Sequence, residues 1–320
     1  MIENISDNLF KLEIPLPRNP LKALNSYLVT SPERNLIIDT GMNRPACLDA
    51  MQTCLKKLAV DLRKTDLFIT HMHADHSGLI STLASSESRV YCRQPDTETI
   101  NSTASWDPVL EFAVLNGFPN DKAAIKLHPG FKFRNQGEVN FTLVSDGDEI
   151  KVGDYTLTCI ATPGHTRGHT CLYEKNKKYL FSGDHVLFKI TPNIALFDDD
   201  HNPLDQYLQS LSKVYEMDVD LVLPAHRWLS PNLRQRIDEL KEHHQIRCHN
   251  ILRVLDEGPH NAYDIASKIE WDLSYDNWEE VHISQKWFAT GEVIAHLKYL
   301  QELNQVDYFV HDKIRHFELN

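Results

Sequence analysis

Short apolar runs, separated by turn-forming residues, dominate the first two thirds of the chain. Runs of about four to eight residues rich in Val, Ile, Leu, Tyr and Phe are typical of strands, and Gly, Asn and Asp between them mark turns. The clearest predicted strands cover residues 24–30, 35–41, 66–71, 139–145, 155–162, 169–174, 177–184 and 220–226. The pattern predicts a layered α/β or α+β domain over residues 1–230.

Two other regions have a different pattern. Residues 94–138 carry aromatic side chains among polar ones, which predicts helical segments and loops inserted between strands. From Pro231, apolar residues recur at helical spacing until Gly258 and Pro259 end a long helix. A helix, a second helix and a terminal β-hairpin are expected to follow, and this order predicts a small winged-helix-like α+β domain over residues 231–320.

Composition narrows the class of protein. The chain has 320 residues, 42% of them hydrophobic and 24% charged, as in soluble globular proteins. No apolar run approaches the ~18 residues that span a bilayer, and the N-terminus lacks a secretory signal. We therefore expect a cytoplasmic protein without a membrane partner. The six cysteines form no CxxC pair, which favours reduced, mostly buried thiols. The net charge of −12 argues against phosphate-backbone binding by the bulk surface.

The stretch TDLFITHMHADHSG concentrates four metal-binding side chains at the end of an apolar strand. They are His71, His73, Asp75 and His76. Residues two apart on an extended strand point the same way, so His71 and His73 can face one ion together. Asp75 and His76 follow as the chain turns and can point to a neighbouring position. A chance cluster would leave the apolar strand that delivers these residues unexplained.

Three further apolar strands also end in a metal-competent residue. IATPGH delivers His165, YLFSGD delivers Asp184 and LVLPAH delivers His226. A side chain at the end of a buried strand is held stiffly, and a metal site needs several rigid donors that converge. Five imidazoles and two carboxylates suit a pair of borderline divalent ions, most simply zinc, with iron or manganese as alternatives.

HMHADH, TPGHTRGHT, FSGD and LPAH resemble the ligand motifs of the metallo-β-lactamase superfamily, especially its glyoxalase-II-like hydrolases, over roughly residues 20–230. The resemblance implies an αββα sandwich. It also implies that His71, His73 and His165 hold a first metal, that Asp75, His76 and His226 hold a second, and that Asp184 bridges the two. The C-terminal part is similar to the winged-helix extension of β-lactamase-like proteins, which include ribonucleases and uncharacterised hydrolases.

This chemistry predicts a binuclear metal-dependent hydrolase. Zinc lowers the pKa of bound water from 15.7 to about 7, so a bridging hydroxide is available to attack an acyl or phosphoryl centre. Asp75 is expected to orient that nucleophile as well as bind metal. We expect a small-molecule acyl substrate such as a thioester or lactone. A ribonuclease or phosphodiesterase is the alternative, although residues 231–320 hold ten basic and sixteen acidic residues. A homodimer stays open, and substrate-binding residues are unassigned.

Several other polar residues have simpler interpretations. His169 and His185 are expected to support the site without binding metal. Asp39 is expected to brace the turn at Gly41. His243 and His244 are expected on a solvated helix face, and the acidic run at residues 198–200 with His201 on a surface loop.

Overall fold

The computed structural model describes residues 1–120, 128–272 and 277–320. They form two compact units. Unit 1 comprises residues 1–103, 129–192 and 210–237, and unit 2 comprises residues 104–128, 193–209 and 238–320. The chain therefore passes between the units several times. The predicted division into domains of residues 1–230 and 231–320 stays a prediction. The metal-type motifs all lie in unit 1.

A mixed sheet in unit 1 contains the strands β1 to β7 in sequential order. Its strands are antiparallel from β1 to β4 and parallel from β4 to β7. Their bounds are β1 (Ile2–Ser6), β2 (Leu9–Pro15), β3 (Ala23–Val29), β4 (Asn35–Ile38), β5 (Thr65–Phe68), β6 (Val90–Cys92) and β7 (Phe141–Leu143). Parallel strands share the edge at which their carboxyl ends lie, so loops that follow them meet there.

A second sheet has the order β12-β11-β10-β9-β8. The pair β11–β12 is parallel and the other pairs are antiparallel. The strands are β8 (Glu149–Val152), β9 (Tyr155–Ala161), β10 (Thr170–Glu174), β11 (Tyr179–Gly183) and β12 (Leu221–Pro224). All eight strands predicted from the sequence are present, several of them two to four residues shorter than expected. The strands β1, β2, β6 and β8 were not predicted.

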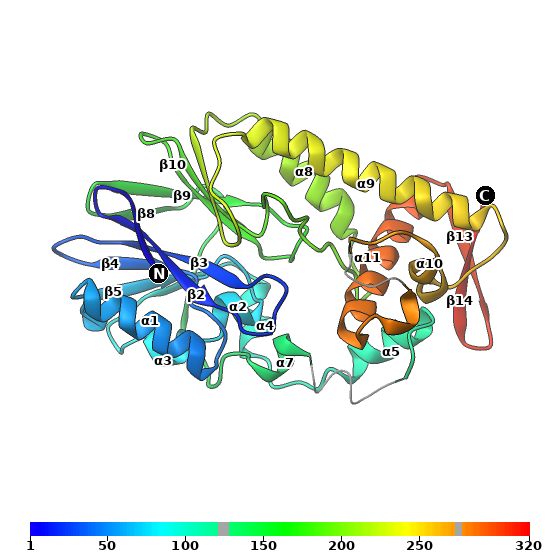
Figure 1. Ribbon diagram of the computed structural model, residues 1–320, viewed down its shortest axis with the longest axis horizontal. Helices are drawn as coiled ribbons and strands as arrows, with labels where there is room; N and C mark the ends of the chain where they lie inside the picture. Colours follow the sequence, from blue (N-terminus) through cyan, green and yellow to red (C-terminus); the bar gives the residue numbers. More distant parts are fainter. Residues whose placement is uncertain (121–127, 273–276) are drawn as a thin grey trace. The chain divides into compact units, whose positions relative to one another are not determined.

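Alternation along the strands explains how the layers stack. On β3, Leu24 and Leu28 pack with the buried face of α1 (Pro45–Lys57), whereas Tyr27 and Val29 belong to the core between the two sheets. The Tyr27 ring meets Phe181 of the second sheet edge-on, with the ring centroids 5.3 Å apart. The helices α1 and α3 (Ile80–Leu83) cover the outer face of the first sheet (Figure 1).

The outer face of the second sheet contacts the C-terminal half of α8 (Pro203–Tyr215). Within unit 1, Ser210 Oγ donates to Pro163 O over 2.8 Å, and Lys213 Nζ donates to Ala161 O over 3.1 Å. The order helix, sheet, sheet, helix confirms the predicted αββα sandwich. Shorter helices in unit 1 are η1 (Leu62–Lys64), α2 (Ala74–Ser77), α4 (Asp96–Asn101) and α7 (Pro129–Lys132).

Unit 2 contains the helices and the hairpin predicted for the end of the chain. They are α9 (Leu233–Leu255) from residue 238 on, α10 (Ala262–Lys268), η2 (Trp278–Glu280), α11 (Ile283–Glu302), β13 (Val306–His311) and β14 (Ile314–Leu319), together with α5 (Asp107–Leu115) from the inserted region. The predicted order of elements is confirmed, and its assignment as a winged helix stays a prediction. No helix in the described ranges combines the length and apolar composition that crossing a membrane requires.

Gly291 allows a close approach within unit 2. Leu196 N donates to Gly291 O over 3.0 Å, and Phe197 stacks on Trp287 of the same helix with ring centroids 4.8 Å apart. A Cβ at Gly291 would lie 2.6 Å from Phe197 Cζ. The absence of a side chain there lets residues 193–197 cross α11 in contact with its backbone.

Candidate metal centre

The predicted ligands all follow strand ends in unit 1. His71 and His73 lie three and five residues after the end of β5, and the short helix α2 then carries Asp75 and His76. Because β4, β5 and β6 run parallel, this segment leaves the sheet at the edge where their carboxyl ends meet. The helix α2 thus begins close to His71 and His73, which precede it in the chain.

The other three ligands come from the second sheet. His165 lies in the connection between β9 and β10, Asp184 directly follows β11, and His226 comes two residues after β12. The strands β11 and β12 pair in parallel, so Asp184 and His226 leave the sheet at the same edge.

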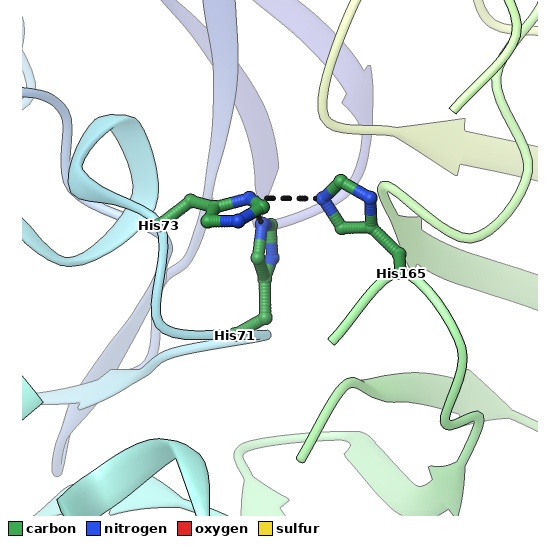
Figure 2. A group of neighbouring side chains, drawn as sticks. All are labelled: His71, His73 and His165. Carbon is green, nitrogen blue, oxygen red and sulfur yellow. Dashed lines mark hydrogen bonds between the residues drawn. The ribbon is translucent and has the colours of Figure 1, made fainter. Parts of the chain in front are cut away.

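Three imidazoles form the first group of candidate ligands. His71 Nε2 and His165 Nε2 each lie 3.0 Å from His73 Nδ1 (Figure 2). A neutral imidazole nitrogen carries either one hydrogen or one lone pair, so His73 Nδ1 cannot satisfy both neighbours equally. A cation between the three lone pairs would satisfy all of them, and this is the arrangement of a three-histidine metal site.

The second group joins Asp75, His76 and His226. Asp75 Oδ2 lies 3.4 Å from His226 Nε2 and 3.8 Å from His76 Nε2. Asp184 contacts both groups, because its Oδ2 lies 3.6 Å from His76 Nε2 and 3.6 Å from His165 Nε2. Its Oδ1 lies 3.5 Å from His226 Nε2. Asp184 therefore lies beside ligand atoms of both groups.

Buried atoms without partners indicate that these groups are built for cations. His76 Nε2, His226 Nε2 and Asp184 Oδ1 are buried and accept or donate no hydrogen bond within the described part of the chain. A buried polar atom that stays unpaired costs about 1–3 kcal/mol, and these three lie beside one another at the site. The contacts that His76 Nε2 and His226 Nε2 make with Asp75 and Asp184 are 3.4–3.8 Å long, longer than an ordinary N–H···O hydrogen bond. They are close to the roughly 3.4 Å between two ligands of tetrahedral zinc with bonds of about 2.1 Å.

The first group is electrically ready to bind a cation. Burial, reinforced by the neighbouring imidazoles, lowers the pKa of His71 well below its ordinary value. Burial and the adjacent His165 lower the pKa of His73 to about 3. Both rings are therefore neutral at physiological pH, which is the form that coordinates metals.

The carboxylates of the second group are ionised. Burial alone would raise the pKa of Asp75 and of Asp184, but the imidazoles of His76 and His226 outweigh it and lower both. Burial would lower the pKa of His76, and the surrounding carboxylates, Asp39 first among them, raise it instead. A cation bound there would take the place of a proton on His76.

Asp39 supports His76 from the side opposite the ligand atom. Its Oδ2 lies 2.8 Å from His76 Nδ1, and Thr70 N donates to its Oδ1 over 2.9 Å. The expectation that Asp39 braces the turn at Gly41 was wrong. Asp39 is only 1% exposed, so its carboxylate must be satisfied by buried donors, and these belong to Thr70 and His76. Such a contact fixes the tautomer and orientation of a ligating imidazole.

Asp96 ties the two ligand-bearing segments together, and the sequence analysis did not single it out. Its Oδ2 accepts from Met72 N over 2.9 Å and from Thr166 Oγ1 over 2.6 Å, while its Oδ1 accepts from Gly168 N over 2.7 Å. Met72 lies between His71 and His73, and Thr166 directly follows the third imidazole. The available signal was an acidic residue at the start of a helix after an apolar run, which is common on surfaces.

His169 supports Asp184, in agreement with its predicted role. Asp184 N donates to His169 Nε2 over 3.1 Å, and His169 Nδ1 lies 2.8 Å from Thr162 Oγ1. Gly183 makes this contact possible, because a Cβ there would lie 2.7 Å from His169 Nε2. His185 is buried beside it, with the two ring centroids 6.1 Å apart.

One prediction about the linking helix was wrong. His244 is not on a solvated face but is 1% exposed in unit 2, where its Nδ1 lies 3.0 Å from His296 Nε2. The reason is packing against α11, a helix that begins almost forty residues later in the chain. His243 is partly exposed. The acidic run lies in unit 2, where Asp199 pairs with Arg315 at 2.6 Å.

Comparisons with known proteins identify the family of this chain. Residues 21–226 match the model of the metallo-beta-lactamase superfamily. The beta-lactamase-like protein 2 homolog of Caenorhabditis elegans is 28% identical over 277 residues, covering 85% of this chain and 79% of that protein. The acyl-coenzyme A thioesterase MBLAC2 of Bos taurus is 28% identical over 238 residues, covering 70% of this chain and 80% of that protein.

A solved structure extends the similarity to the fold. A metallo-beta-lactamase family protein from Thermus thermophilus is 25% identical and superposes with a TM-score of 0.84, covering 99% of this chain and 100% of that chain. The family model spans well over half of the sequence, including every candidate ligand. With its αββα sandwich and its His and Asp clusters, the chain belongs to the metallo-beta-lactamase superfamily.

Proposed function

We propose that this protein is a metal-dependent hydrolase that cleaves a small acyl thioester, with a lactone as the nearest alternative substrate. The observation that carries the proposal is the convergence of three groups of ligand atoms, each group within 4.8 Å, from segments far apart in the chain. Three buried atoms of these groups have no other partner within the described residues. Membership of the superfamily supports a hydrolase, and one relative is named as an acyl-coenzyme A thioesterase.

Two divalent ions are proposed, with zinc first and iron or manganese as alternatives. The first would be held by His71, His73 and His165, the second by Asp75, His76 and His226, and Asp184 would contact both. Such ions, when bound, would lower the pKa of water and polarise the acyl oxygen. An aspartate at the bridging position supports assignment to the glyoxalase-II-like branch, because a cysteine at the second site is typical of many true β-lactamases.

Asp75 is proposed to orient the attacking water. Its carboxylate is buried and ionised, and its Oδ2 lies 3.4 Å from His226 Nε2, so its other oxygen can accept a hydrogen bond from water. The water oxygen adds to the acyl carbon, the carbon–sulfur bond breaks, and the products are the carboxylic acid and the thiol. The two hydrogens of water are thereby divided between the acid and the thiol.

A ribonuclease or other phosphodiesterase is the competing proposal, since winged-helix extensions occur in nucleic-acid enzymes. Residues 231–320 carry ten basic and sixteen acidic residues, and a surface that follows a phosphate backbone is normally basic. We therefore rank this function second. The winged-helix assignment, a cytoplasmic location and a homodimer remain predictions of the same kind.

Metal analysis and a substrate panel test the proposal. We expect about two ions per chain, and hydrolysis of thioesters or lactones but not of phosphodiesters or a β-lactam chromophore. Asp184→Ala should lose metal binding and turnover together. Asp220→Ala, an exposed aspartate just before β12, is the matched control and should retain both. Full turnover by metal-free protein, or cleavage of phosphodiesters alone, would overturn the thioesterase assignment.

A further inference from the structure

Basic residues gather beside the metal centre although the chain as a whole is acidic. Four segments of unit 1, residues 16–23, 40–46, 129–137 and 225–232, contain no acidic residue. The same segments contain six basic residues, which we call the basic cluster: Arg18, Lys22, Arg44, Lys132, Arg134 and Arg227.

Hydrogen bonds join these segments to one another. Arg44 Nη1 donates to Pro17 O over 2.9 Å, and Arg227 Nη2 donates to Pro20 O over 2.6 Å, so both contact the loop between β2 and β3. Asn43 N donates to Phe133 O over 2.9 Å, which attaches the segment around α7 to residue 43. The four segments therefore form one continuous part of unit 1 and not four separate patches.

The basic cluster adjoins the second group of metal ligands. His226 Nδ1 contacts Ala23 O, at the end of the β2–β3 loop, over 2.8 Å. Thr40 N and Thr40 Oγ1 both donate to His76 O over 2.7 Å. At Gly78, which directly follows α2, a Cβ would lie 2.7 Å from Phe133 O. The segments that carry the cations are thus in contact with the backbone or ring of two candidate ligands, His76 and His226.

Aromatic rings hold three of the cations in place. The Arg44 guanidinium lies 4.8 Å and the Lys132 ammonium 5.3 Å from the centroid of the Phe133 ring, and the Arg134 guanidinium lies 4.7 Å from that of Phe131. No member of the basic cluster forms an ion pair with a carboxylate among the residues that the structure describes. Guanidinium groups fixed on rings and not neutralised by carboxylates are suited to bind phosphate.

We propose that the basic cluster binds the phosphates of a phosphopantetheine thioester while the metal centre receives its acyl group. This inference rests on the proposed thioesterase function and adds the chemistry of the leaving group. A thioester carried by phosphopantetheine places negative charge away from the scissile bond, along the thiol arm. The cluster lies to one side of the site, next to the second ligand group, and binds the phosphates of that arm. It takes no part in the reaction at the acyl carbon.

The test compares two thioesters of one acyl group. Hexanoyl-coenzyme A carries phosphates, and hexanoyl-N-acetylcysteamine has the same reacting bond without them. We expect the metal-loaded protein to have a kcat/KM about tenfold or more higher for the coenzyme A ester, with a preference that shrinks as salt rises. In the Lys132→Gln/Arg134→Gln variant, the ratio of the two kcat/KM values should fall about tenfold. Lys57→Gln, roughly 20 Å away at the other end of α1 from Arg44, should leave the ratio unchanged.

A binding measurement separates the two proposals. Desulfo-coenzyme A lacks the thiol, so calorimetric titration into metal-stripped protein reports on the basic cluster alone, and the double variant should weaken its Kd about tenfold. Hydrolysis of both esters at one rate, with no binding of desulfo-coenzyme A, would overturn the inference and leave the thioesterase function standing. Binding of desulfo-coenzyme A without hydrolysis of either ester would support phosphate binding by the basic cluster and refute the thioesterase.

Two further arms identify the source of the phosphopantetheine. A higher kcat/KM for hexanoyl-acyl carrier protein than for hexanoyl-coenzyme A, lowered by the double variant, supports the inference and assigns the substrate to a carrier protein. The reverse order supports the inference and assigns free coenzyme A. Binding of single-stranded RNA that depends on the cluster, with none of desulfo-coenzyme A, would contradict it.

Discussion

Replacing Asp96 by Asn tests whether a buried carboxylate holds the two ligand segments in register. In the best arrangement, the Asn oxygen takes the place of Oδ2 and keeps the bonds from Met72 N and Thr166 Oγ1. The Asn NH2 group then faces Gly168 N, where Oδ1 accepted over 2.7 Å, so a donor meets a donor. One charge-assisted bond is lost and one buried N–H is left unpaired, which together cost about 2–3 kcal/mol.

The effect on metal binding follows from the position of these contacts. Met72 lies between two candidate ligands, and Thr166 follows a third, so loosening Asp96 lets the first ligand group spread. Loss of a supporting contact of this kind typically weakens metal affinity 10- to 100-fold, or about 1.4–2.8 kcal/mol. We expect Asp96→Asn to fall in this range.

Two measurements distinguish a positioning role from a merely structural one. Urea unfolding of metal-stripped protein gives the free energy of unfolding, and competition with a chromophoric chelator gives the affinity for Zn²⁺. The matched control is Glu98→Gln, the same chemical change two residues away on an exposed side chain, with an expected effect below about 0.5 kcal/mol. A variant that is less stable but binds Zn²⁺ as tightly as the wild type would refute the positioning role. An unchanged free energy of unfolding would refute the hydrogen bonds themselves.

Three other changes have expected outcomes. Asp39→Asn keeps an acceptor near His76 Nδ1 but removes its charge, so chelator competition should show about tenfold weaker binding of the second ion and little change for the first. Burial lowers the pKa of His296 to about 4, so its contribution to stability is full above its ordinary pKa of 6.5 and is lost as the pH falls toward 4. His296→Gln should therefore remove about 3 kcal/mol of the loss of unfolding free energy between pH 7 and 4, measured by urea unfolding of metal-free protein, and an unchanged pH profile would contradict this. Gly291→Ala places a Cβ 2.6 Å from Phe197 Cζ and should lower the free energy of unfolding by about 1–3 kcal/mol, whereas an unchanged midpoint in the same assay would show that residues 193–197 are free to move.

The ligand-bearing strands could be predicted because their signal is local. An apolar run that ends in a histidine or an aspartate is visible in a few consecutive residues, and burial of that run by the sheets fixes the last residue at an edge. His71, Asp184 and His226 were found in this way, and the structure brings all of them into groups within 4.8 Å. The division of the ligands between two ions came from the resemblance to the superfamily, since spacing along one chain does not distinguish the groups.

The supporting residues could not be predicted because their partners are distant in the sequence. Asp96 accepts hydrogen bonds from donors 24, 70 and 72 positions away, and nothing in its neighbourhood marks it. His244 is different, since it shares the helical spacing of apolar residues in α9 and that pattern already indicated a buried face. The histidine was assigned to solvent because its partner, His296, lies 52 residues later. The helical spacing of His244 predicted its burial correctly, whereas the polarity of its side chain did not.

The net charge of a whole chain does not show whether one part of its surface can bind phosphate. A total of −12 excludes a phosphate-binding bulk surface, but it is silent on four short segments that the fold joins beside His76 and His226. If the basic cluster binds the thiol arm, the metal centre breaks the carbon–sulfur bond and the cluster selects the leaving group. Substrates should then be ranked by the charge of the thiol they release, and the length of the acyl chain should matter less than the presence of a phosphate.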